Sequence, residues 1–107
     1  MSAMGPALAW CPFPDTESAE ASINTVLDEG LAACANILPG LRTHFVWQGK
    51  KEEAEEVGVL FKTDLALLEA LSARVCQLHP YEQPAFVGWR CDYASPATAL
   101  WLGALAA

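Results

Sequence analysis

Basic residues are scarce in this sequence of 107 residues. It contains 6 lysines and arginines against 13 aspartates and glutamates, so its formal net charge is −7. A chain with this charge lacks the basic surface that binds nucleic acid or an anionic membrane, and we expect neither as a partner. Its field favours cations instead. Hydrophobic residues make up 53% of the chain and charged residues only 18%, which excludes intrinsic disorder.

Several local motifs are also missing. The four cysteines are far apart and form no C-x-x-C pair, which argues against a zinc ribbon or a thioredoxin-type centre. There is no glycine-rich phosphate loop and no Ser-His-Asp order of a hydrolase. The apolar run 97–107 is too short to span a bilayer. The first residues show no basic region followed by an apolar stretch, so we expect no secretory signal and a cytoplasmic protein.

Two alternating hydrophobic periodicities predict the order β-α-β-β-α-β followed by a last helix. The expected strands cover 7–13, 31–38 continuing after a bend as 41–47, 57–61 and 85–91. The expected helices begin at the caps Asp15 or Thr16, Thr63 or Asp64, and Ser95, and they end at Gly30, Pro80 and Leu102. This order is typical of an α+β, ferredoxin-like split β-α-β sandwich, here a single domain over 1–107.

Right-handed crossovers place both long helices on one face of such a sheet. The strands between 31 and 47 are apolar on both sides, so the other face also needs a cover. We therefore predict a symmetric oligomer, with the hairpin around Gly49 reaching a neighbouring subunit. The expected packing and interface anchors are Trp10, Trp47, Trp89 and Trp101.

Three stretches carry a resemblance to one family. They are 31–40 (LAACANILPG), 47–50 (WQGK) with the acidic run up to Glu56 and Lys62-Thr63, and 79–84 (HPYEQP). In this order and spacing, from about residue 7 to 102, the chain resembles the CutA family of divalent-cation tolerance proteins. Phe45 and Thr98 stand where that family usually carries tyrosines, which argues against a pocket lined by a tyrosine pair.

The resemblance implies a ferredoxin-like subunit in a tight homotrimer, similar in plan to the PII regulatory proteins. It links the protein to copper and other divalent cations and attaches no reaction to it. It also places the metal-associated residues at Cys11 and His79. A thiolate and an imidazole suit copper, and the elements that carry them should lie side by side. A closed site would need a third ligand, such as Glu82 or a residue of a neighbouring subunit.

Each candidate ligand also has a structural interpretation. Cys11 can be a small buried hydrophobe, and His79 can bond carbonyls at the end of the second helix. We expect Cys34 and Cys76 in the core, Cys91 partly exposed, and the acidic run 52–56 on a solvated hairpin; His44 is expected to be a polar strand residue.

The leading functional hypothesis is a non-enzymatic homotrimer that binds a divalent metal ion, copper or another. Two alternatives stay open. One is a PII-like trimer that binds a small metabolite in the clefts between subunits, and the other is a small enzyme acting in the same clefts.

Overall fold

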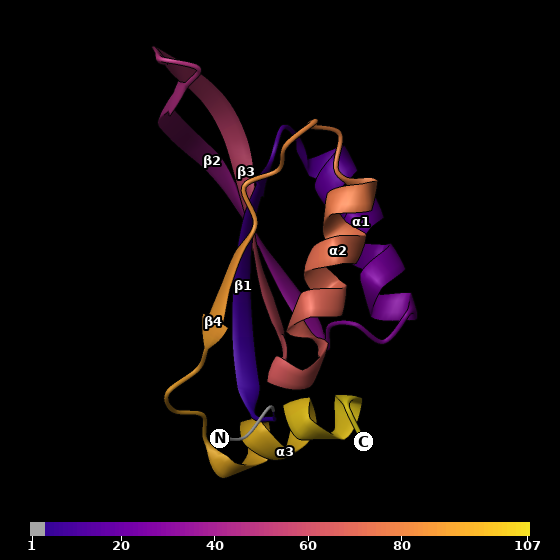
Figure 1. The fold of residues 1–107 in the computed structure, drawn as a ribbon. Helices are drawn as coiled ribbons and strands as arrows, with labels where there is room; N and C mark the ends of the chain where they lie inside the picture. Colours follow the sequence, from indigo (N-terminus) through magenta and orange to yellow (C-terminus); the bar gives the residue numbers. More distant parts are fainter. Residues whose placement is uncertain (1–3) are drawn as a thin grey trace.

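The protein is described here by a computed structural model that covers residues 4–107 (Figure 1). The elements are β1 (Pro6–Phe13), α1 (Thr16–Asp28), β2 (Cys34–Trp47), β3 (Lys50–Asp64), the 3-10 turn η1 (Leu65–Leu67), α2 (Leu68–Leu78), β4 (Val87–Arg90) and α3 (Pro96–Leu105). The strands form one antiparallel sheet in the order β2-β3-β1-β4. The predicted α+β, ferredoxin-like sandwich with a terminal helix is confirmed.

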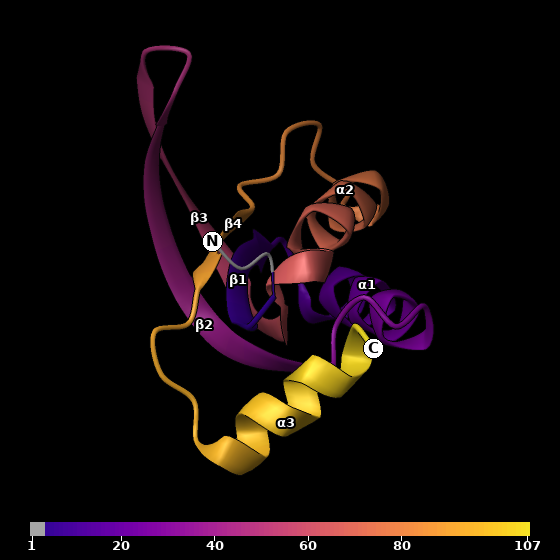
Figure 2. The same ribbon diagram turned by 60° about the horizontal axis from the view of Figure 1, so that its bottom comes forward.

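Helices α1 and α2 lie together on one side of the sheet, as Figures 1 and 2 both show. Every second residue of β1 is fully buried beneath them, because side chains alternate between the two faces of a strand. The core comprises Ala9, Cys11, Phe13, Ala19, Ile23, Val26, Ala32, Val57, Val59, Phe61, Leu71 and Val75. Leu27 of α1 is 37% exposed, whereas Ser22 of the same helix is buried. No helix in the described range 4–107 is long and apolar enough to cross a membrane.

Side chains cap the helices at the predicted positions. The Ser18 amide donates to Asp15 Oδ1 (2.8 Å) at the start of α1, and Ser95 caps α3. Gly30, with φ +72°, follows the end of α1 in the left-handed conformation that glycine favours. Asp64 caps the turn η1 rather than α2 itself, and its other carboxylate oxygen accepts from the Gly5 amide.

The β2–β3 hairpin is longer than predicted. The bend at Pro39-Gly40 does not divide the strand: it is a bulge between Leu38 and Leu41, with pairing on both sides of it. β1 ends where Phe13 pairs with Val57, whereas the hairpin continues to its turn after Trp47. The hairpin therefore projects beyond the body of the subunit (Figure 1). β4 is shorter than the predicted strand 85–91.

The sheet face away from α1 and α2 is apolar. Trp10 lies opposite Leu60 on β3 and Val87 on β4, and Leu8 lies opposite Trp89. Val87 is 55% exposed and Trp89 is 45% exposed. We call these five residues the open sheet face. Helix α3 crosses one end of the sheet, where Leu102 is buried, and leaves this face uncovered (Figure 2).

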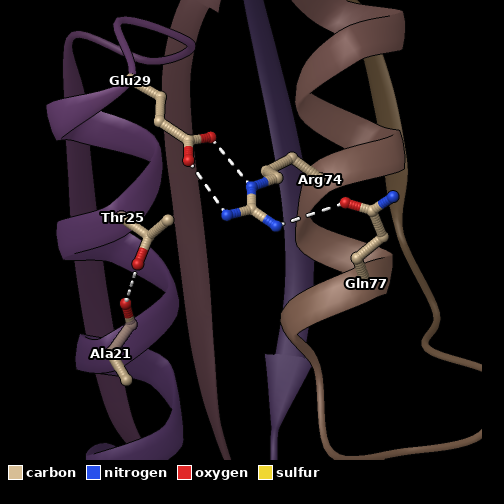
Figure 3. Close-up of polar contacts among 5 residues, drawn as sticks. All are labelled: Ala21, Thr25, Glu29, Arg74 and Gln77. Atoms are coloured by element: carbon tan, nitrogen blue, oxygen red, sulfur yellow. Dashed lines mark hydrogen bonds and ion pairs between the residues drawn. The ribbon is translucent and has the colours of Figure 1, made fainter.

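An ion pair joins the two helices on the outer side of their layer (Figure 3). The Arg74 guanidinium donates through Nε and Nη2 to the two carboxylate oxygens of Glu29, at 2.8 and 2.9 Å, and through Nη1 to Gln77. The hydrogen bond from Arg74 lowers the pKa of the Glu29 carboxyl. This contribution to stability is therefore complete at neutral pH and is lost as the pH falls through the lowered pKa.

Gly58 offers a test of packing on the open sheet face. A Cβ added there would lie 2.6 Å from Trp10 Cζ2 and 2.9 Å from Leu41 Cδ1. We expect Gly58→Ala to lower the free energy of unfolding by about 1–3 kcal/mol, because the indole must move. The control is Gly103→Ala in α3, where nothing lies within 4 Å and stability should rise by about 0.5–1 kcal/mol. Equal stability of the two variants in denaturant unfolding would contradict this packing.

Candidate functional site

The structure brings both sequence-predicted metal residues to one backbone atom, the Pro12 carbonyl oxygen. Nε2 of His79 lies 2.7 Å from this oxygen, and Sγ of Cys11 lies 3.7 Å from it. Cys11 comes from the end of β1, and His79 directly follows α2. The expectation that these two elements lie side by side is therefore met, and we call this arrangement the Cys11–His79 pair.

Both ring nitrogens of His79 are engaged. Nδ1 accepts a hydrogen bond from the Tyr81 amide at 3.1 Å, so Nε2 carries the proton and donates to Pro12. The ring is 6% exposed and stacks on Phe13, with ring centroids 4.2 Å apart. The His79 amide donates to the Val75 carbonyl at the end of α2 (2.9 Å), as the structural interpretation expected, and the ring bonds a carbonyl of β1 in addition. A metal at Nε2 would have to displace the proton that now reaches Pro12.

The Cys11 thiol is fully buried in the core. Burial, helped by the nearby Cys76 thiol and Glu56 carboxylate, raises the pKa of this thiol to about 12. Thiolate is the form that binds metal, so a cation at Cys11 must also displace a proton.

Tyr81 connects the pair to a carboxylate that the sequence pattern did not single out. Its hydroxyl donates to Glu56 Oε2 at 2.8 Å, and its ring lies against His79 with centroids 4.8 Å apart. Burial, with the Glu56 hydrogen bond, raises the pKa of Tyr81 to about 12, so the phenol stays protonated as a donor. Glu56 is only 8% exposed, which corrects the expectation that the whole run 52–56 is solvated. The tyrosine of the HPYEQP stretch was the available signal for this contact.

A groove of about 470 Å³ lies beside this network. It is bounded by the start of α1 at residues 14–16, the segment after the β2 bulge at residues 40–42, and residues 55–57 of β3. The bulge shifts the register by one residue and so places Leu41 opposite Glu56. The segment at the bend of the hairpin, with Gly40 at φ +75°, thus forms one wall of the groove.

The remaining candidates lie elsewhere. Cys76 is exposed, and Cys34 is half-buried, which corrects the expectation of core positions for both. Cys91 is partly exposed as expected. His44 lies on the exposed hairpin, 3.5 Å from Glu53, as a polar strand residue.

The donor set fits a soft metal ion in kind but does not by itself close a site. Sulfur and imidazole nitrogen are ligands that copper prefers. Within residues 4–107, no three His, Cys, Asp or Glu side chains are grouped to hold an ion. Glu82, the third ligand considered from the sequence, is exposed and belongs to no such group. Further ligands would have to come from a rearrangement or from another subunit.

Comparisons with known proteins agree with this architecture. The model of one family, the CutA1 divalent ion tolerance protein, matches residues 7–104. The divalent-cation tolerance protein CutA of Pyrococcus horikoshii is 41% identical over 95 residues, which cover 89% of this chain and 92% of that protein.

Solved structures of the same kind share the fold. CutA from Xylella fastidiosa superposes with a TM-score of 0.89 at 33% identity, covering 94% of this chain and 96% of that one. The periplasmic divalent cation tolerance protein CutA from Archaeoglobus fulgidus superposes with a TM-score of 0.88 at 26% identity, covering 94% and 97%.

The thiols should differ sharply in reactivity. At about pH 8, a thiol with a pKa of about 12 is ionised in only about one molecule in ten thousand, so Cys11 should resist iodoacetamide while exposed Cys76 is labelled. Peptide mass spectrometry after a short pulse measures both sites. In denaturant the two should react at similar rates. Fast labelling of Cys11 in the folded protein would contradict the buried, protonated thiol.

Proposed function

The chain belongs to the CutA1 family of divalent ion tolerance proteins, and from this premise we propose that it is a homotrimer that binds a divalent metal ion, copper foremost, without catalysing a reaction. The observation that carries the metal proposal is the convergence of Cys11 and His79 on the Pro12 oxygen. These are the two side chains in the described chain that combine soft sulfur and imidazole donors at one point.

The chemistry of this pair makes metal binding a competition with protons. The Cys11 thiol must ionise, and the His79 imidazole must exchange a hydrogen bond for the ion. His79 is held by two hydrogen bonds and Cys11 by burial, so a metal ion would have to replace these interactions. A protein of this kind would bind the metal only where the ion outcompetes the protons, which suits tolerance to excess metal better than constitutive storage.

The open sheet face supports the trimer. Monomeric proteins rarely expose a contiguous apolar patch such as Trp10, Val87 and Trp89, and a symmetric assembly is the simplest cover for it. The hairpin adds Phe45 and Trp47, 39% and 44% exposed, beyond the body of the subunit. Its projection would let it contact a neighbouring subunit.

We place the protein in the cytoplasm. The four cysteines are all free, and free thiols persist in a reducing compartment. The Archaeoglobus fulgidus relative is described as periplasmic, so location within this family follows the individual chain and not the fold.

Copper affinity should depend on both members of the pair. We expect Cys11→Ser and His79→Ala each to weaken copper binding at least about tenfold, as loss of one strong ligand does. Because the thiol pKa lies near 12, the apparent affinity of the wild type should rise by up to about tenfold per pH unit below it. Calorimetric titration with copper measures these effects.

The exposed-thiol variant Cys76→Ser is the matched control and should keep wild-type affinity. Thermal unfolding of each variant separates loss of a ligand from loss of the fold. If both pair variants bind copper as the wild type does, the pair is not the site and the acidic hairpin 52–56 takes its place. Loss in Cys76→Ser alone would assign binding to an adventitious surface thiol.

The trimer should be visible by sedimentation at micromolar concentration. Trp47→Ala should weaken the association by about 2–4 kcal/mol, because a buried indole is a typical interface anchor. Leu27→Ala removes a comparably exposed apolar side chain from the helix layer, away from the hairpin, and should leave the assembly intact. A stable monomer of the wild type would refute the proposal.

A further inference from the structure

The groove between the start of α1 and the β2–β3 hairpin has features of a ligand site of its own. It is an open groove of about 470 Å³ formed by three separate segments, which is room for a small molecule. Neither Cys11 nor His79 lines it. The groove therefore lies beside the Cys11–His79 pair and is not part of it.

Glu56 is the strongest indication of a ligand. Its side chain is more than nine-tenths buried, and only one of its oxygens is satisfied, since Oε2 accepts from the Tyr81 hydroxyl. Oε1 has no hydrogen-bond partner in the described residues. Every fully buried side-chain oxygen in those residues does have a partner, so Oε1 cannot be fully buried. Oε1 therefore keeps accessible surface, and the groove is the space that Glu56 lines. A largely buried carboxylate that is held through one oxygen and leaves the other accessible can accept a hydrogen bond from a ligand.

The charged residues around Glu56 Oε1 favour a positively charged hydrogen-bond donor. Asp15 and Glu55 also line the groove, against a single guanidinium, that of Arg42. Arg42 in turn lies 3.7 Å from Glu53, outside the groove lining. The net field in the groove is therefore negative and disfavours anions.

The size and the lining of the groove favour an organic cation over a bare metal ion. Pro14, Leu41 and Val57 give the groove apolar surface between its carboxylates. No three metal-ligating side chains of residues 4–107 come together, here or elsewhere, and a cavity of this volume is much larger than an ion. An alkyl chain would use the apolar walls, and its ammonium group would reach Glu56.

We propose that this groove binds a small organic ammonium compound, with the ammonium on Glu56 Oε1 and the alkyl part against Leu41 and Val57. Tyr81 is the positioning residue, because its hydroxyl fixes the carboxylate through the other oxygen. Asp15, held by the Ser18 amide, adds negative charge at the groove wall.

The test uses n-butylamine as the probe and n-butanol as its neutral counterpart, followed by NMR titration of the full-length, metal-free protein. Butylamine should shift resonances of the groove segments 14–16, 40–42 and 55–57 in a saturable way. Butanol should bind at least about tenfold more weakly, as loss of a charge-assisted hydrogen bond predicts. Equal binding of the two probes, or shifts confined to other surfaces, would overturn the proposal. No binding of butylamine would do the same, including the case where a neighbouring subunit closes the groove.

Two variants, one in the groove and one outside it, locate the interaction. Glu56→Gln keeps an acceptor for the Tyr81 hydroxyl but removes the charge, and it should raise the Kd for butylamine at least about fivefold. Glu20→Gln removes the same charge from the exposed surface of α1 and should change the Kd by less than about twofold. Equal effects of these two variants would show general attraction to an acidic protein and no site.

A third variant, Arg42→Gln, tests the proposal without changing the buried carboxylate of Glu56. It removes the positive charge from the groove, so butylamine should bind as tightly as before or more tightly. If Glu56→Gln fails to fold, this variant decides alone: weaker butylamine binding in Arg42→Gln would overturn the proposal.

Discussion

The hydrogen bond from His79 to the Pro12 carbonyl joins the end of α2 to the end of β1, where the candidate site lies. The Pro6 carbonyl bonds the Cys91 amide, so by alternation the even-numbered carbonyls of β1 point toward β4. β4, however, pairs with β1 only as far as Trp10. The Pro12 carbonyl therefore has no strand partner on that side, and the His79 ring supplies the missing donor.

The same geometry explains why a proline is tolerated there. Within a strand, the amide and the carbonyl of one residue point to the same side, so position 12 faces the gap beyond β4. A residue with an N–H at this position would need a second acceptor, which β4 does not reach far enough to provide. Proline removes that requirement, and one imidazole then satisfies the single carbonyl. The fold and the proposed metal site thus depend on the same atom.

Much of this architecture follows from local sequence pattern, and its main exception depends on pairing with another strand. Alternation in 7–13, the caps Asp15 and Ser95, and the Gly30 stop were predictable because each acts within a few residues. The continuity of β2 through Gly40 was not, because β3 supplies the pairing on both sides of the bulge. Cys76 was assigned to the core because it lies next to the buried stripe of α2, yet it directly follows the buried Val75, and successive helical residues point about 100° apart, so its side chain is exposed.

The candidate site likewise has a part that the sequence predicts and a part that it does not. The family resemblance indicated that His79 of HPYEQP lies close to Cys11. This could be predicted because it depends on the order of the elements and on which strands are adjacent. The burial of Glu56 could not be predicted, because in sequence it is one of four glutamates in a polar run. It becomes distinct only where the Tyr81 loop folds over the end of β1 and brings a phenol to its carboxylate. Through its amide to His79 and its hydroxyl to Glu56, Tyr81 joins the Cys11–His79 pair to the groove in one hydrogen-bonded path. The proposed metal site and the proposed ligand groove therefore share one residue, whose amide bonds His79 and whose hydroxyl bonds Glu56.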